Sequence, residues 1–258
     1  MPSRKLQRIL LGSLSIAAVI ALWIYLTGPG KVKPMILPPP ADVLEGAIDI
    51  YRGYLGVPWL EHFRASLLVM LTGYFSAIVI GVPLGIAVAW WRPVETLLNP
   101  LISMLRPIPP PAWIPLAILW FGIDLAGKAF IVFVAAIVPC IMNSYLAVRS
   151  TPPELLASAR SLGASQRVLL LEVALPSGLP AILTGLRIAL GTSWATIVAA
   201  ELVVSLAGFG FLIMNGYRNL ESNIVMVGMI AVAVIGFLMN WAFLVIERRL
   251  LPWGEMHD

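Results

Sequence analysis

The stretch TPPELLASARSLGASQRVLLLEVALPSGLPAILTGLR, residues 151–187, is the one sizeable helical segment of this chain that is not simply apolar, and hydrophobic stretches flank it. Thr151 is placed to cap a helix whose first turn contains two prolines and a glutamate, which is the spacing of a capping box. Gly163 is suited to end that helix in a left-handed conformation, and Ser165 to cap a second helix that runs to Pro176. The stretch therefore predicts a helix–turn–helix elbow, interpreted as a cytoplasmic docking segment.

The composition around this elbow is that of a membrane protein. Of the 258 residues 60% are hydrophobic and 12% are charged, and the mean hydropathy is +0.93, which excludes a soluble core. We predict an all-α, polytopic chain in which residues 1–258 form one transmembrane domain and residues 151–176 form a cytoplasmic coupling segment within it. Gly81 and Gly85 form a GxxxG pair, a weak signal of close helix packing. About six stretches approach the roughly 20 apolar residues needed to cross a bilayer, with the third interrupted by prolines: residues 9–27, 65–91, 112–121 with part of the upstream flank, 129–148, 178–204 and 224–246.

Basic residues indicate the orientation in the membrane. The first stretch follows Arg4, Lys5 and Arg8, and no small-residue cleavage site follows it, so an uncleaved anchor is favoured over a signal peptide. An even number of crossings then places both termini on one side, with Trp23 and Trp253 as interfacial anchors. We predict cytoplasmic termini, and we attribute the net charge of +4 to orientation and not to nucleic-acid binding. The inside set is Arg4, Lys5, Arg8, Arg92, Arg106, Arg149, Arg160, Arg167, Arg248 and Arg249, and the outside set is Lys31, Lys33, Arg52, Arg64, Lys128 and Arg218.

Motifs for catalysis or metal binding are weak. Residues 122–128 match the phosphate-loop pattern GxxxxGK, but Ala129 stands where a hydroxyl should follow and no strand precedes the motif, so an outer turn is favoured over a nucleotide site. The two histidines, His62 and His257, are far apart and have no carboxylate cluster beside them. The single cysteine, Cys140, is assigned to packing. The sequence therefore predicts no catalytic residue, no metal site and no enzyme activity of its own.

A run of prolines from Arg106 to Pro115 interrupts the third hydrophobic stretch. Each proline removes a backbone donor, so the run cannot form a regular helix that faces lipid. Irregular backbone at membrane depth is tolerated where it lines a cavity, and we therefore interpret Pro109, Pro110 and Trp113 as candidates for the translocation route. A loop at the inner membrane surface is the alternative.

Polar residues within the other stretches are candidates because they are costly in a bilayer. Arg187 and Glu201 are 14 positions apart on one helix, about 20 Å along its axis, so they are not expected to pair with each other. We expect Arg187 to extend inward or to meet carbonyls, and Glu201 to face a polar vestibule. Asn143 and Asn240 favour interhelical hydrogen bonds. The candidates for the route are Pro109, Pro110, Trp113, Asn143, Trp194 and Glu201.

Residues 157–176 carry a family resemblance. An Ala-Ser-Ala triplet, a glycine, an aliphatic residue and Leu-Pro follow one another at fixed intervals: Ala157, Ser158, Ala159, Gly163, Val173, Leu175 and Pro176. This spacing resembles the EAA loop of binding-protein-dependent ABC importer permeases. Further stretches are similar to the nitrate, sulfonate and taurine subfamily of these permeases: LPPP at Leu37, RPIPP at Arg106, ILWFG at Ile118, VRSTPPELL at Val148 and ILTGLRIALG at Ile182.

The resemblance implies a type I ABC importer permease core in the bacterial inner membrane. It implies a homodimer that works with two cytoplasmic ATPase subunits, which bind ATP and magnesium, and with a periplasmic or lipid-anchored substrate-binding protein. Ala157 departs from the motif, which has glutamate there; Glu154, one turn earlier, is a partial substitute. The residues expected to contact the ATPase are Glu154, Ala157, Ser158, Ala159, Arg160, Leu162, Gly163 and Ala164.

The transported solute stays open between taurine, alkyl sulfonates, nitrate, bicarbonate, aromatic acids and precursors like those of thiamine, with a small anion favoured. A transporter driven by an ion gradient is the alternative class. Such a protein normally carries paired intramembrane acids and inverted halves, whereas this chain shows one intramembrane glutamate, Glu201, and no such symmetry.

Overall fold

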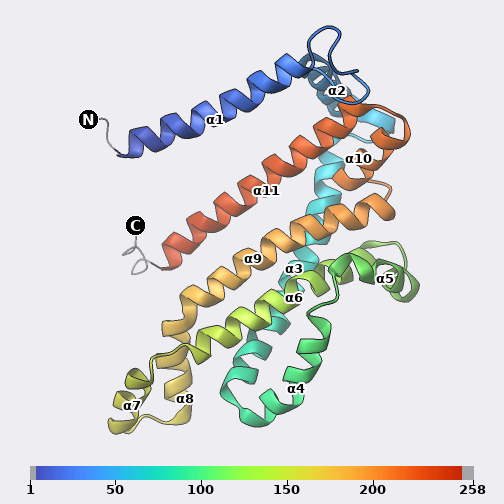
Figure 1. The fold of residues 1–258 in the computed structure, drawn as a ribbon. Helices are drawn as coiled ribbons and strands as arrows, with labels where there is room; N and C mark the ends of the chain where they lie inside the picture. Colours follow the sequence, from blue (N-terminus) through green and yellow to red (C-terminus); the bar gives the residue numbers. More distant parts are fainter. Residues whose placement is uncertain (1–3, 252–258) are drawn as a thin grey trace.

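The computed structural model describes residues 4–251, and side chains from Leu10 onward. Trp253 and His257 therefore lie outside the described residues. Within this range all regular elements are helical, as predicted (Figure 1). They are α1 (Arg4–Leu26), α2 (Pro40–Gly53), η1 (Tyr54–Gly56), α3 (Trp59–Trp90), α4 (Arg92–Leu105), η2 (Pro110–Trp113), α5 (Ile114–Phe121), α6 (Leu125–Arg149), α7 (Pro153–Ser161), α8 (Gln166–Val168), η3 (Leu169–Ala174), α9 (Leu175–Val203), α10 (Phe209–Arg218) and α11 (Ser222–Leu250).

Four of the helices in the described range are long and apolar enough to cross a membrane: α3, α6, the continuous helix Gln166–Val203, and α11. They correspond to the second, fourth, fifth and sixth predicted stretches. The first predicted stretch corresponds to α1, and the third matches the shorter apolar helix Pro110–Phe121. The proline run divides the third region into α4 and the pair η2–α5, and the 8 residues of α5 extend only about 12 Å.

The centre of the bundle is the packing of α3 and α9 against α6. A Cβ added at Gly73 of α3 would lie 2.5 Å from the Ala129 carbonyl oxygen, and one at Gly81 would lie 2.8 Å from the Cβ of Cys140. On α9, a Cβ at Gly178 would lie 2.6 Å from the Ala147 carbonyl oxygen. Small residues allow membrane helices to approach this closely, so the GxxxG signal and the packing role of the buried Cys140 are confirmed.

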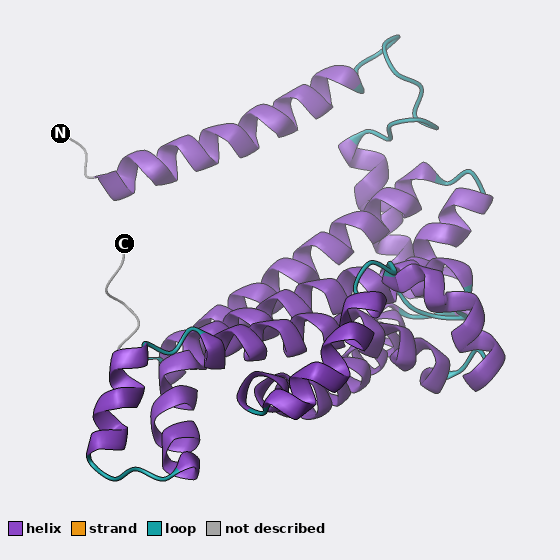
Figure 2. Ribbon diagram, turned by 60° about the horizontal axis from the view of Figure 1, so that its bottom comes forward, coloured by secondary structure: helices purple, strands orange, loops and turns teal. Residues whose placement is uncertain are grey.

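The first helix lies apart from this bundle. Figure 2 shows α1 joined to the remaining helices through the loop at its C-terminal end. There the indole Nε1 of Trp23 donates to the Pro38 carbonyl oxygen at 3.0 Å, and the ring packs beside buried residues of α2, α10 and α11. Trp23 therefore fastens α1 at the end of the bundle that also carries α2 and α10.

Candidate functional site

The elbow, residues 151–176, projects from the end of the bundle toward which α11 also runs (Figure 1). Its first helix, α7, begins at Pro153, with Pro152 at the capping position. The prediction that Thr151 caps this helix is wrong: Thr151 is buried, and its Oγ1 has no hydrogen-bond partner among the described residues. Helical geometry is disfavoured for a residue that precedes proline, and Pro152 has a non-helical ψ of 127°, so the helix starts at Pro153.

The turn of the elbow has the predicted geometry. Gly163 has a left-handed φ of 86°, and its N–H donates to the Arg160 carbonyl at 2.9 Å. The N–H of Ala164 donates to the Ala159 carbonyl at 3.1 Å, which completes a Schellman motif. The Oγ of Ser165 then accepts from the Val168 N–H at 3.4 Å, so the predicted cap of the second helix is confirmed.

The second helix of the elbow was predicted to end at Pro176, but it continues beyond that residue. It continues as a 38-residue helix, Gln166–Val203, through the π-helical segment η3. Pro176 lies in the first turn of α9 immediately after this segment. A π-turn rearranges the local hydrogen bonds, which allows the chain to accommodate a proline without ending the helix. The elbow is therefore directly continuous with a membrane-spanning helix.

The tip and the base of the elbow differ in burial. Leu162 is 89% exposed and Leu155 is 49% exposed, whereas Leu169 at the base is 1% exposed. The base packs against the ends of α3 and α6 through Leu170 and Ala174. Of the other residues singled out in the sequence, the exposed ones are Glu154, Ala157, Ser158, Arg160, Gly163 and Pro176, and the half-buried ones are Ala159, Ala164, Val173 and Leu175.

The proline run lies beside a cavity of about 560 Å³ between α3, α4 and α6. Pro110 and Trp113 line this cavity together with mostly apolar side chains and Arg106, whereas Pro109 is exposed at the start of η2. The Nε1 of Trp113 is buried and has no hydrogen-bond partner within residues 4–251. The run is thus shielded by protein along one side.

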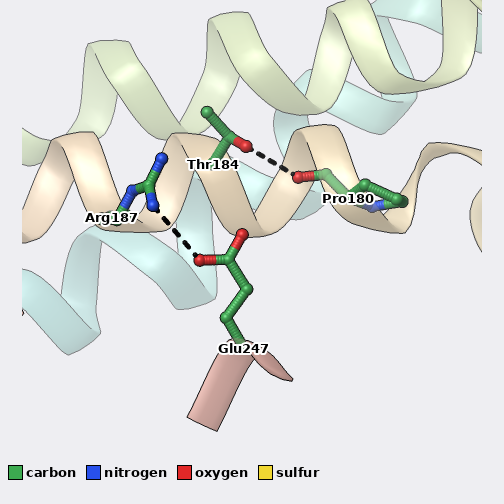
Figure 3. Close-up of polar contacts among 4 residues, drawn as sticks. All are labelled: Pro180, Thr184, Arg187 and Glu247. Carbon is green, nitrogen blue, oxygen red and sulfur yellow. Dashed lines mark hydrogen bonds and ion pairs between the residues drawn. The ribbon is translucent and has the colours of Figure 1, made fainter. Parts of the chain in front are cut away.

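Arg187 was expected to extend inward or to meet backbone carbonyls; within the described residues it instead pairs with a carboxylate. Its Nη1 lies 3.5 Å from an Oε atom of Glu247 on α11, and the two side chains are 36% and 18% exposed (Figure 3). One turn away, the Thr184 hydroxyl donates to the Pro180 carbonyl at 2.9 Å. Glu247 was not among the residues predicted from the sequence, although its position just before Arg248 and Arg249 near the end of α11 was a usable signal. The ion pair joins α9 to α11.

Asn143 and Trp194 also have contacts within the chain. Asn143 donates through Nδ2 to the Pro139 carbonyl of its own helix at 2.9 Å, so the expected interhelical hydrogen bond is not formed. Its side chain packs against Gly185 of α9, where the two helices approach closely. Trp194 is 7% exposed and donates through Nε1 to the Val232 carbonyl of α11 at 2.9 Å. Both residues thus hold helices together.

Glu201 is 2% exposed, and the prediction that it faces a polar vestibule is wrong. Its carboxylate is enclosed between α3, α9 and the start of α10, where it accepts hydrogen bonds from Ser66 and from the Gly210 N–H. Sequence reasoning did not identify Ser66, because a lone serine in an apolar span carries no pattern.

The glycine-rich turn between α5 and α6 is an ordinary connection. Gly122 ends α5 with a positive φ of 77°, and Asp124 precedes the first residue of α6. The Nζ of Lys128 lies 3.2 Å from the Ser205 hydroxyl, to which it donates. The predicted turn is present, with a helix and not a strand before it.

The chain thus combines an exposed elbow with a long apolar helix that continues directly from it. Residues 81–252 match the family described as the binding-protein-dependent transport system inner membrane component. The chain belongs to this family. It is a multi-pass membrane permease of the ABC transporter class, in the nitrate, sulfonate and taurine subfamily.

Curated relatives cover nearly the whole permease. The taurine transport system permease protein TauC of Escherichia coli (strain K12) is 36% identical over 94% of this chain and 89% of TauC. The putative aliphatic sulfonates transport permease protein SsuC of Bacillus subtilis (strain 168) is 32% identical over 100% of this chain and 92% of SsuC. The bicarbonate transport system permease protein CmpB of Synechococcus elongatus is 32% identical over 96% and 91%.

A solved structure shares the fold of the permease. The MetNI methionine ABC transporter, in an inward-facing conformation, aligns with a TM-score of 0.66 at 20% identity. The alignment covers 74% of this chain and 94% of the matched chain. The predicted type I importer permease core is therefore confirmed at the level of the fold.

Proposed function

We propose that this permease works as a homodimer with two cytoplasmic ABC ATPase subunits, which bind ATP and Mg²⁺, and with a periplasmic or lipid-anchored substrate-binding protein. The permease chain itself binds no cofactor in this proposal, and its termini and elbow face the cytoplasm. The exposed tip of the elbow carries the proposal. Leu162 is 89% exposed at the end of a projecting helix pair. Removing an apolar side chain from water is favourable, so Leu162 is suited to burial against a partner protein.

The proposed mechanism is the transmission of movement through the elbow. ATP binding closes the ATPase subunits, and the contacts that they make from Glu154 to Ala164 displace the elbow. Because the second helix of the elbow continues into α9, its displacement tilts a membrane-spanning helix and switches the permease between inward-open and outward-open states. Glu154 is exposed one turn before Ala157, where it is placed to replace part of the missing motif glutamate.

We propose a small anionic solute, such as a sulfonate, nitrate or taurine. The support is the chemistry named for the relatives, which are permeases for taurine, aliphatic sulfonates and bicarbonate at similar identity. These relatives resemble the chain to a similar degree, yet they are named for different solutes. We therefore infer that selectivity resides largely in the binding protein. Identification of the ligand retained by the cognate binding protein during purification tests this choice, and a cationic or neutral ligand contradicts it.

We propose that the proline run, residues 106–115, flanks the translocation route. The support is its irregular backbone beside a cavity, an arrangement that is tolerated at membrane depth only when protein or water shields it. Single cysteines from Ile108 to Ile114 test this role in the assembled transporter. Labelling with a bulky thiol reagent is expected to block uptake at some of these positions, and uniform protection with intact uptake contradicts the proposal.

Reconstitution tests the proposed assembly. The permease is co-expressed with its neighbouring ATPase and binding protein, purified through a tag on the permease, and placed in liposomes. We expect the ATPase to copurify and uptake to require ATP on the elbow side. Uptake by the permease alone on an ion gradient would instead establish a secondary transporter.

The orientation is tested separately with a membrane-impermeant maleimide on intact cells. Native Cys140 is 1% exposed, so it contributes little background. A cysteine at Tyr217, on the α10 side, is expected to be labelled from outside, and a cysteine at Leu162 only after the membrane is opened. The reverse pattern contradicts the cytoplasmic elbow.

A further inference from the structure

Glu201 lies near the end of α9 that is opposite the elbow, and it is enclosed by protein. Its carboxylate accepts a hydrogen bond from the Ser66 hydroxyl of α3 at 2.7 Å, and another from the Gly210 N–H at 3.0 Å. Bonds to a carboxylate are about twice as strong as bonds between neutral groups, and a buried carboxylate that loses them keeps its full desolvation cost. Glu201 is therefore firmly held to both α3 and α10.

Ser66 and His62 of α3 complete the arrangement around the start of α10. The Phe209 N–H donates to the Ser66 Oγ at 3.2 Å, and the Gly208 N–H donates to the His62 Nδ1 at 3.1 Å. Three successive amides, those of residues 208–210, are thus bonded to side chains of three different residues on two other helices. The first amides of a helix have no partner within it, so these residues cap α10 from outside, and the carboxylate also suits the positive end of its dipole. We call His62, Ser66 and Glu201 the capping cluster.

The backbone at the start of α10 is closely packed against the capping cluster. Gly208 has a positive φ of 116°, and a Cβ there would overlap the Glu201 carboxylate. A Cβ at Gly210 would lie 2.6 Å from the Cβ of Glu201. Phe209, which is 0% exposed, packs edge-on against Trp59 of α3 with the ring centroids 5.1 Å apart. The start of α10 therefore cannot shift relative to α9 without breaking buried bonds.

The helix that carries Glu201 begins at the elbow. The continuous helix Gln166–Val203 places Gln166 and Glu201 about 50 Å apart along its path, with a change of direction between α8 and α9 (Figure 1). Proteins transmit displacements through packed elements with few alternative arrangements. One hydrogen-bonded helix thus joins the elbow at one end to the capping cluster at the other.

We propose that Glu201 and Ser66 are positioning residues for transport: they oblige α10 to move with α9, so that displacement of the elbow reaches the outer surface formed by α10 and the α10–α11 turn. In the other direction, a binding protein that docks on this surface acts through the capping cluster on the elbow and hence on the ATPase. This inference rests on the proposed function, because it assigns a role to the end of α9 farthest from the ATPase.

The test uses the whole transporter in lipid nanodiscs with its ATPase and loaded binding protein. Ser66→Ala and Glu201→Gln are compared with Ser76→Ala on the same helix. The Ser76 hydroxyl is exposed and, within the described residues, donates to the Thr72 carbonyl alone. We expect both cluster variants to assemble and to keep basal ATP hydrolysis. Stimulation of hydrolysis by the loaded binding protein is expected to fall about fivefold or more, the range of a typical coupling free energy. Ser76→Ala is expected to behave as wild type.

Wild-type stimulation in both cluster variants would overturn the inference and leave the proposed function intact. Failure of the wild-type permease to bind an ATPase would instead remove the proposed function. A second measurement does not depend on the cluster variants folding. Spin labels are placed on exposed positions, at Tyr217→Cys on α10 and at Leu97→Cys on α4, which shares no buried cluster with α10 among the described residues. Their separation is measured before and after trapping the ATPase in its closed state. We expect the distance to change when the elbow moves, and a fixed distance with a moving elbow label at Leu162→Cys would contradict the inference.

Discussion

The two ends of the helix Gln166–Val203 are built differently. At the elbow, Leu162 is 89% exposed and a Cβ added at Gly163 would meet no atom within 4 Å. At the opposite end, Glu201 is 2% exposed and a Cβ at Gly208 would overlap it. Both glycines have a positive φ, yet one turn stands in open space and the other is enclosed.

This difference shows which end makes its contacts within the chain and which end leaves side chains uncovered. The capping cluster accepts hydrogen bonds from the amides of residues 208–210, and Phe209 beside it is fully buried, so this end is stabilised by contacts within the chain. Among the described residues, the buried His62 Nε2 of the cluster has no hydrogen-bond partner. The elbow satisfies its backbone through the Schellman motif but leaves apolar side chains at its tip. A rigid turn that presents uncovered apolar side chains is suited to binding another protein, whereas the enclosed turn is suited to passing on movement.

Introducing a charge into the open turn is expected to have the largest effect. Gly163→Glu places a side chain at a left-handed position and puts a carboxylate where the ATPase is proposed to dock. We expect normal insertion and a loss of uptake of at least about tenfold, since burying an unpaired charge at an interface costs several kcal/mol. Uptake is measured in membrane vesicles at matched permease levels. Full uptake at a normal level would show that the open turn is not a docking surface.

Alanine substitutions at Gly163 and Gly208 compare the two turns through the free energy of unfolding. Gly163→Ala adds only the strain of a positive φ, about 1 kcal/mol, because the surrounding space is open. Gly208→Ala adds the same strain and an overlap with a buried carboxylate, so we expect a loss of about 2–4 kcal/mol. Thermal unfolding of the two variants in detergent gives the comparison. Equal losses would mean that the enclosed turn can relax as freely as the open one.

The sequence predicted the open end better than the enclosed one. The elbow depends on neighbouring residues, since Gly163 and Ser165 act within a few positions of the backbone groups that they satisfy. The two errors there were also local: the proline pair moved the helix start beyond Thr151, and the π segment allowed the helix to continue past Pro176.

The enclosed end depends on residues far apart in the chain. Ser66 and Glu201 are separated by 135 positions, and their pairing follows from the packing of α3 beside α9. Because a charge in a membrane is costly, the sequence correctly indicated that Glu201 is unusual. The same cost applies to a glutamate in a vestibule and to one that caps a helix, so it could not distinguish the two. Arg187 is a similar case, because its partner Glu247 lies 60 positions away, near the C-terminal end of α11.

The ion pair between the two ends is expected to contribute less than either turn. Arg187 and Glu247 are 36% and 18% exposed and 3.5 Å apart, so the attraction is partly screened. A double-mutant cycle with Arg187→Gln and Glu247→Gln is expected to give a coupling energy of about 0.2–1 kcal/mol in thermal unfolding. A value of several kcal/mol would mean that α11 is held to the helix as firmly as α10 is, and the contrast between the ends would then extend along the whole helix.

The smallest expected effect is a pH dependence confined to the enclosed end. Burial raises the pKa of Tyr54 above its ordinary value of 10.0, and the hydrogen bond that its hydroxyl donates to Glu221 raises it further. A pKa that is higher in the folded state means that the phenol stabilises the fold at every pH below about 10, and that this contribution disappears as the pH rises through the folded-state pKa.

Tyr54→Phe should therefore lower the unfolding temperature slightly at about pH 8 and reduce its further decline toward about pH 10.5, relative to wild type. Tyr51→Phe is the matched control, because Tyr51 is 77% exposed on the neighbouring helix. Since Tyr54 joins the α2 side to the α10–α11 turn, the effect reports on bonds made within the chain at the enclosed end. An identical pH profile in wild type and Tyr54→Phe would show that the hydrogen bonds of Tyr54 do not stabilise this end of the molecule.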